Sequence, residues 1–163
     1  MRLTGVTISG ADDGVTFPSL LALSAEFPFV EWGVLVSGRS GRPRYPSVWW
    51  LAGIRGVPGV RRYAYHACGQ ESRALQAGGP DLRIDRSGGR GVRGEFAPMP
   101  GCKVGYAGGI GPDNVVEVLD RLETFGHTYW IDMESGVRTA DQFDLHKVWR
   151  VLDLAAPFVA KDA

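Results

Sequence analysis

The segment KVGYAGGIGPDNVVEV, at residues 103–118, joins a short apolar strand directly to an amphipathic helix through a glycine-rich turn. Gly108, Gly109 and Gly111 have no Cβ, so the turn can adopt positive φ angles and bring backbone N–H groups close to a ligand. The unpaired N–H groups and the dipole at the start of the helix favour an anion at this place. The segment therefore predicts a phosphate-binding turn. The alternative is that its glycines serve only to pack the helix tightly on a sheet.

A second turn of the same kind, IDMESGVR at residues 131–138, directly follows the last apolar strand. Loops at the C-terminal ends of neighbouring parallel strands meet at one face, and barrel folds hold sugar phosphates with two such loops. We therefore expect Ser135 and Gly136 to lie beside Gly108 and Gly109 and to complete a phosphate site.

Apolar, β-prone stretches alternate with helical patterns along the chain. Strands are expected at residues 3–9, 29–37, 60–68, 82–84, 102–107 and 128–133, and helices at 18–26, 46–55, 71–77, 112–125 and after residue 139. This alternation is typical of α/β proteins with parallel strands and right-handed crossovers. We expect one domain over residues 1–163, with its ligand face at the C-terminal ends of the strands.

The charge balance and the apolar runs argue against several classes of partner. Lys and Arg together number 18, as do Asp and Glu, so the formal net charge is zero and no global field attracts nucleic acid or an anionic membrane. No apolar run approaches the roughly 20 residues of a membrane helix. Two cysteines without a recognisable signal peptide indicate reduced thiols and a cytoplasmic location. The sequence predicts neither a metal site nor a cofactor.

Several of these segments resemble motifs of the phosphoribosylanthranilate isomerases, which are (β/α)₈ barrels. AGGIGPDNV and WIDMESGVRT are similar to the last two strand–loop units of that family, where the motifs read approximately AGGLxPxNV and DxSSGVE. Three earlier segments match in the same order. TISG resembles the KICG motif of the first strand, RPRY the SPRY-type loop after the second, and ID with GGRG the LLD and GGTG segments of the sixth. The C-terminal match is the most specific.

The resemblance implies a reaction and a role for each matching residue. In that family the reaction is an Amadori rearrangement, in which an acid protonates the ribose ring oxygen, an imine forms and a base removes the C2′ proton. The roles implied are Asp85 as the acid, Ser9 at the base position, Asp132 beneath the substrate, Arg44 on the substrate carboxylate, and Gly108, Gly109, Ser135 and Gly136 on the phosphate.

Two residues depart from the family pattern. Ser9 stands where the family has a cysteine, and a hydroxyl is too weak a base unless a partner deprotonates it. His66 is either that partner or a packed core residue. Glu134 replaces a small hydroxyl residue, and it is either a replacement base near Asp132 or a carboxylate that faces solvent or pairs with Arg138.

Arginines in the loop after the strand at residues 82–84 offer a second anion site. Arg86, Arg90 and Arg93 can together bind a diphosphate or a carboxylate. The alternative is that they form a solvated loop surface.

The length of the chain limits the fold that the resemblance implies. A (β/α)₈ barrel seldom has fewer than about 200 residues, and this chain has 163. We therefore expect a truncated TIM-type barrel of about six parallel strands, with a second subunit in a dimer relieving its open edge. The expected function is binding of a small phosphorylated ribose derivative at the C-terminal face, with Amadori isomerisation as its catalytic form. The alternatives are a non-catalytic protein that sequesters a phosphorylated sugar or nucleotide, and a scaffold without a ligand.

Overall fold

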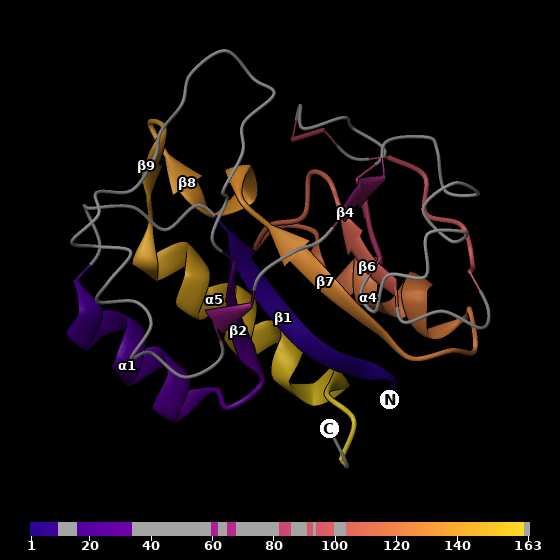
Figure 1. Cartoon of the computed structure of the whole chain (residues 1–163), viewed down its shortest axis with the longest axis horizontal. Helices are drawn as coiled ribbons and strands as arrows, with labels where there is room; N and C mark the ends of the chain where they lie inside the picture. Colours follow the sequence, from indigo (N-terminus) through magenta and orange to yellow (C-terminus); the bar gives the residue numbers. More distant parts are fainter. Residues whose placement is uncertain are drawn as a thin grey trace.

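The computed structural model describes residues 1–9, 16–33, 60–61, 65–67, 82–85, 91–92, 94–99 and 104–161. Its centre is a sheet of seven parallel strands (Figure 1). The strands are β1 (Leu3–Ser9), β2 (Val30–Gly33), β3 (Val60–Arg61), β4 (Tyr65–Ala67), β5 (Leu82–Asp85), β6 (Val104–Ala107) and β7 (Tyr129–Met133). The described helices are α1 (Phe17–Glu26), α4 (Val115–Glu123) and α5 (Leu145–Ala155), with short 3₁₀ helices η1 (Ser135–Val137) and η2 (Ala156–Phe158).

The strand order is that of a TIM-type barrel opened at one place. The order is β3-β2-β1-β7-β6-β5-β4, so that the first strand pairs with the last long strand and the remaining strands follow in chain order on both sides. The α/β class and the truncated TIM-type arrangement are thus confirmed. The sheet has seven strands where about six were expected, because the stretch predicted as one strand at residues 60–68 forms both β3 and β4.

The helices cover one face of this sheet and bury a single apolar core. Alternate residues of the strands, such as Val6 and Ile8 on β1, point into this core and are completely buried. The helical spacing in α4 and α5 directs their apolar residues to the same core. The buried helical residues are Val115, Val118, Leu119 and Leu122 on α4 and Val148, Val151, Leu152 and Ala155 on α5.

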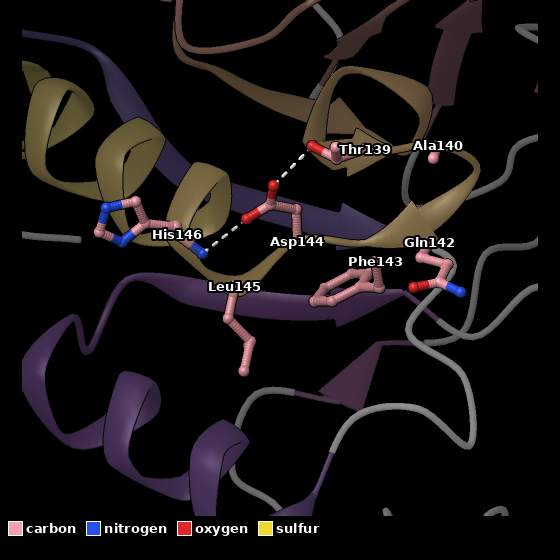
Figure 2. A pocket seen from close by; sticks show the side chains of 7 residues that line it. All are labelled: Thr139, Ala140, Gln142, Phe143, Asp144, Leu145 and His146. Carbon is pink, nitrogen blue, oxygen red and sulfur yellow. Dashed lines mark hydrogen bonds between the residues drawn. The ribbon is translucent and has the colours of Figure 1, made fainter.

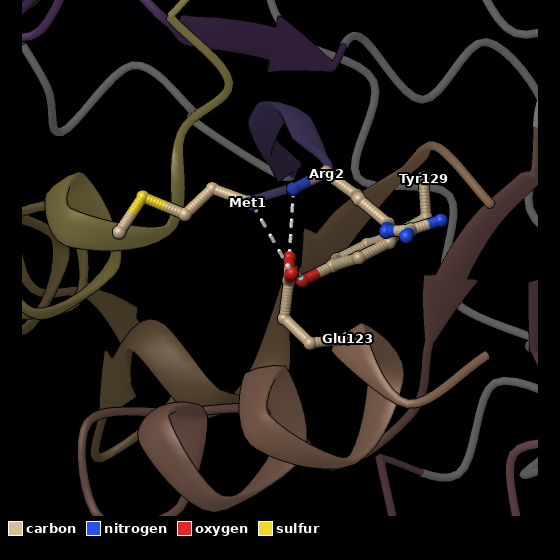
Figure 3. Close-up of polar contacts among 4 residues, drawn as sticks. All are labelled: Met1, Arg2, Glu123 and Tyr129. Atoms are coloured by element: carbon tan, nitrogen blue, oxygen red, sulfur yellow. Dashed lines mark hydrogen bonds and ion pairs between the residues drawn. The ribbon is translucent and has the colours of Figure 1, made fainter. Parts of the chain in front are cut away.

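The end of α4 is joined to the start of β1 by one carboxylate. Glu123 Oε1 accepts hydrogen bonds from the backbone N–H of Arg2, at 2.8 Å, and from the hydroxyl of Tyr129, at 3.0 Å (Figure 3). Glu123 Oε2 also lies 3.5 Å from the amino group of Met1. Burial, followed by the nearby charge of Glu123, raises the pKa of Tyr129 well above its ordinary value.

A small antiparallel hairpin that the sequence did not predict follows η1. It consists of β8 (Arg138–Thr139) and β9 (Gln142–Phe143). Its two-residue turn places Ala140 at φ 49° and Asp141 at φ 65°, a conformation that side chains rarely adopt. The predicted helix after residue 139 therefore begins only at Leu145.

Several other predicted elements cannot be compared with the structure. The helices expected at residues 46–55 and 71–77 and the end of the strand at 34–37 lie outside the described residues. Between β5 and β6, residues 94–99 are irregular, and Phe96 and Met99 pack against the core. None of the described helices is long and apolar enough to cross a membrane.

Candidate functional site

The two glycine-rich turns lie in direct backbone contact. A Cβ added to Gly136 would overlap the carbonyl oxygen of Ile110, and one added to Gly111 would lie 3.0 Å from the carbonyl oxygen of Gly136. Any side chain at Gly136 would therefore push the two turns apart. The loops after β6 and β7 form one surface at the C-terminal ends of their strands.

A third segment joins these two turns. Gly91, which follows β5 in the chain, has a φ of +65°, and a Cβ added there would overlap the side-chain oxygen of Ser135. Glycine is therefore required at this position both by the backbone conformation and by the space available. The loops that follow three successive strands, β5, β6 and β7, thus meet at Ser135 and Gly136.

The turn after β6 has the conformation expected of an anion-binding loop. Gly108 and Gly109 have φ angles of 110° and 64°, and both are partly exposed. Among the turn, loop and cap hydrogen bonds of the described residues, none is donated by the backbone N–H of Gly109 or of Gly136. These N–H groups are available to an oxyanion.

The N–H of Gly111 is engaged within the turn. It donates to the side-chain oxygen of Asn114 at 2.9 Å, while the side-chain nitrogen of Asn114 donates to the carbonyl of Gly109 at 2.8 Å. Gly111 was predicted to help bind the phosphate, but in this conformation its N–H is not directed at a ligand. Asn114 was not among the predicted site residues, because it stands at the position of the last glycine in a GxGxxG pattern and so gave no positive signal.

Ser9 and Asp132 form a buried hydrogen-bonded pair on neighbouring strands. The hydroxyl of Ser9, at the end of β1, donates to Oδ1 of Asp132 on β7 at 2.5 Å, and both residues are completely buried. The described partner of Ser9 is thus a carboxylate. His66 lies on β4, and its side chain is outside the described part of the structure.

Asp85 lies on the same face of the sheet as this pair. It is the last residue of β5, it is 3% exposed, and the register aligns it with Ala107 of β6 and through Ala107 with Asp132. Two strand spacings place the Cα atoms of Asp85 and Asp132 roughly 10 Å apart. Ala107, which has a small side chain, is the residue between the two carboxylates in the register of the sheet.

The remaining predicted site residues divide into two groups. Glu134 is partly exposed, and no hydrogen bond or ion pair of its side chain is seen among the described residues. The alternative in which Glu134 pairs with Arg138 is thus not seen among the described residues. A guanidinium N–H of Arg138 donates to the backbone carbonyl of Asp141 at 2.8 Å. Arg44, Arg86, Arg90 and Arg93 lie outside the described residues.

A separate depression of about 440 Å³ lies over the β8–β9 hairpin and the start of α5 (Figure 2). Asp144 in its lining accepts hydrogen bonds from the hydroxyl of Thr139, at 2.6 Å, and from the backbone N–H of His146, at 3.0 Å. The bond from Thr139 is the main reason why the pKa of Asp144 is lowered. The lining consists of Thr139, Ala140, Gln142, Phe143, Asp144, Leu145 and His146. None of the predicted site residues is among them.

The described residues offer no metal site. No group of three or more His, Cys, Asp or Glu side chains within them is arranged to hold a metal ion. The polar groups of the described residues at the ends of β1, β5, β6 and β7 are backbone amides, the buried carboxyl groups of Asp85 and Asp132, the partly exposed carboxyl group of Glu134, and the hydroxyl groups of Ser9 and Ser135. Such a set suits a phosphate group and proton transfer.

Comparison with known proteins supports the resemblance that the motifs suggested. The chain is 37% identical to an N-(5′-phosphoribosyl)anthranilate isomerase of Synechococcus sp. (strain JA-3-3Ab) in a 119-residue alignment, which covers 63% of this chain and 48% of that protein. The similarity to this family of isomerases is therefore confirmed, and the chain spans about half the length of the relative that it matches.

A comparison with solved structures and one with protein-family models were also made. A crystal structure of phosphoribosyl anthranilate isomerase from Thermus thermophilus aligns with 93% of this chain and 72% of its own, at 18% identity and a TM-score of 0.38. No protein-family model matches the chain.

Proposed function

We propose that this chain binds a small phosphorylated ribose derivative at the C-terminal ends of β5, β6 and β7. The observation that carries the proposal is the meeting of three glycine-containing loops at Ser135 and Gly136, where a Cβ at Gly91 or Gly136 would overlap the neighbouring loop. The similarity to a protein named as an N-(5′-phosphoribosyl)anthranilate isomerase supports a phosphoribosyl group as the part of the ligand that is recognised.

The phosphate would be held mainly by backbone groups. The N–H groups of Gly109 and Gly136 and the exposed hydroxyl of Ser135 can donate to its oxygens, and the start of α4 adds a favourable dipole. Charged side chains are not required for this part of the site, since a dianion is stabilised by several convergent amides.

The two buried carboxyl groups would carry out isomerisation in the catalytic form of the proposal. Asp85 would donate a proton to the ribose ring oxygen, and the C1′–O bond would break to give an iminium ion. Asp132 would then remove the C2′ proton, and the resulting enol would become the ketone. In the structure the Ser9 hydroxyl donates a hydrogen bond to Asp132. We therefore assign Ser9 to orienting Asp132. The Asp132 carboxylate, which is a stronger base than a hydroxyl, would remove the proton.

A protein that binds without turnover is the second candidate. The observation that favours it is Ser9 itself, which stands where the resembling motif has a cysteine and which acts as a hydrogen-bond donor to Asp132. Such a protein would keep the phosphate loops and lose the base. Binding and turnover must therefore be measured separately.

Binding is tested by thermal unfolding with ribose 5-phosphate, unphosphorylated ribose and inorganic phosphate. A ligand at one hundred times its Kd is expected to add about 2.7 kcal/mol to the free energy of unfolding. We expect stabilisation by ribose 5-phosphate and none by ribose. Absence of any shift with phosphorylated compounds would refute the proposal.

Turnover is tested with N-(5′-phosphoribosyl)anthranilate. We expect Asp85→Asn to bind this compound and to lose isomerisation, while Asp113→Asn, which changes an exposed carboxylate beside the glycine turn, should retain both. Tight binding with no product from the unaltered chain would establish the non-catalytic candidate instead.

A further inference from the structure

The side chain of Asn114 connects both ends of the glycine turn after β6. Its oxygen accepts the N–H of Gly111 at 2.9 Å, and its nitrogen donates to the carbonyl of Gly109 at 2.8 Å. Asn114 is the N-cap residue of α4, yet its side chain does not cap this helix. An asparagine at this position usually accepts hydrogen bonds from the N–H groups of the first helical turn. Here the Asn114 side chain points the other way and bonds to the loop before the helix.

These two hydrogen bonds fix the direction of the turn amides. Because a peptide unit is planar and trans, holding the carbonyl of Gly109 towards Asn114 turns the N–H of Ile110 in the opposite direction. The N–H of Gly111 is bonded to the Asn114 side chain, so a ligand cannot use it. Gly109 has a φ of 64°, and a glycine left without this brace has many other conformations available.

We propose that Asn114 is a positioning residue for the phosphate site, which holds the turn of Gly108–Gly111 in its anion-binding conformation without touching the anion. The inference rests on the proposed function. A neutral carboxamide is required because the turn needs one acceptor and one donor from the same side chain. Aspartate, when ionised, supplies acceptors only.

The test compares Asn114→Asp with the unaltered chain, using sulfate as the probe and calorimetry to measure affinity. At pH 7 the variant lacks the donor to Gly109 and carries a negative charge near the site, and we expect a loss of at least about tenfold in affinity. Sulfate stays a dianion as the pH is lowered to about 3.5, whereas the introduced carboxyl group, with an ordinary pKa of about 3.9, becomes protonated and can donate again. The affinity ratio of variant to unaltered chain should therefore recover on acidification.

Two other variants separate this role from a general loss of stability. Asn114→Ala should lose affinity at pH 7 and show no recovery at low pH, because alanine can never supply the donor. Thr124→Ala removes a hydrogen bond of 2.7 Å at the opposite end of α4 and should leave sulfate affinity unchanged. Circular dichroism at each pH checks that the variants are folded. If the aspartate variant unfolds in acid, the sulfate affinity of Asn114→Ala at pH 7 alone tests the role of Asn114.

The outcomes distinguish the two proposals. The inference is overturned if both Asn114 variants bind sulfate as tightly as the unaltered chain, if the Asp variant shows the same loss at every pH, or if Thr124→Ala weakens binding equally. If the unaltered chain binds neither sulfate nor ribose 5-phosphate, the proposed function fails, and the role of Asn114 falls with it.

Discussion

The indole ring of Trp130 occupies the space that a side chain at Gly105 would need. The two residues are paired in register on β7 and β6, and Trp130 is completely buried. Trp130 precedes Asp132 by two positions on the same strand, so its side chain lies on the same face, one level nearer the start of β7. The Trp130 ring therefore fills the space on this face of the sheet directly below the level of the carboxylates.

This packing predicts that Gly105→Ala destabilises the protein. The added Cβ would overlap the buried ring, and overpacking of a core typically costs about 1–3 kcal/mol. Gly5→Ala is the matched control, because it adds the same methyl group to another buried strand glycine, where the nearest atom is the Glu31 carboxylate at 3.4 Å. Urea unfolding of both variants checks the prediction, and an equal cost for the two would contradict it.

The contact between Gly91 and Ser135 predicts coupling between these residues. Gly91→Ala should weaken binding of ribose 5-phosphate and lower stability by about 1 kcal/mol or more, because of the positive φ and the overlap with the serine side chain. Ser135→Gly removes the obstacle, so in that background the stability cost of Gly91→Ala should shrink to the backbone component. A double-mutant cycle measures this, and additive costs would show that the overlap has no effect.

The bond between Tyr129 and Glu123 predicts a loss of stability in alkali. The pKa of Tyr129 is raised in the folded protein, so the neutral phenol contributes stability that is fully present below about pH 10, its unfolded value, and that is lost as the pH rises further. Tyr129→Phe should lose about 0.5–1.5 kcal/mol at pH 7 and should show a smaller further decrease above pH 10. Unfolding measured at several pH values checks this; parallel curves for the two proteins would be inconsistent with it.

The turn of the β8–β9 hairpin predicts a stabilising double substitution. Ala140 and Asp141 both have positive φ angles, which the pair Asn-Gly adopts with much less strain in two-residue hairpins. Ala140→Asn combined with Asp141→Gly should raise the free energy of unfolding by about 1 kcal/mol. The bond from Arg138 to the carbonyl of residue 141 uses the backbone, so the substitution retains it. A lower stability of the double variant would show that the native side chains make a compensating contact.

The sequence predicted the elements better than the contacts between them. The bounds of β1 follow directly from a β-prone run that ends in turn formers, and the expected strand at residues 3–9 is the one observed. The β8–β9 hairpin was missed because its turn is Ala-Asp and lacks the Asn-Gly signal. The stretch at residues 60–68 was read as one strand because periodicity does not show where a strand is interrupted.

The pairing inside the candidate site depends on register, which a single sequence does not contain. Ser9 and Asp132 are separated by 123 residues, and only the alignment of β1 with β7 brings the hydroxyl to the carboxylate. The adjacency of the two glycine turns could be expected, because both follow neighbouring parallel strands. That Asn114 takes the N–H of Gly111 could not, since it depends on the rotamer of one side chain.

The pairing of β1 with β7 also has a consequence for the synthesis of the protein. β1 is synthesised well before its partner at residues 129–133, so a nascent chain that ends between the two lacks one of the two neighbours of β1. Contacts between residues so distant in the chain make folding slow, and an exposed strand invites aggregation in the interval. We therefore expect the N-terminal part of this chain to aggregate more readily during synthesis than a fold built from local pairings would.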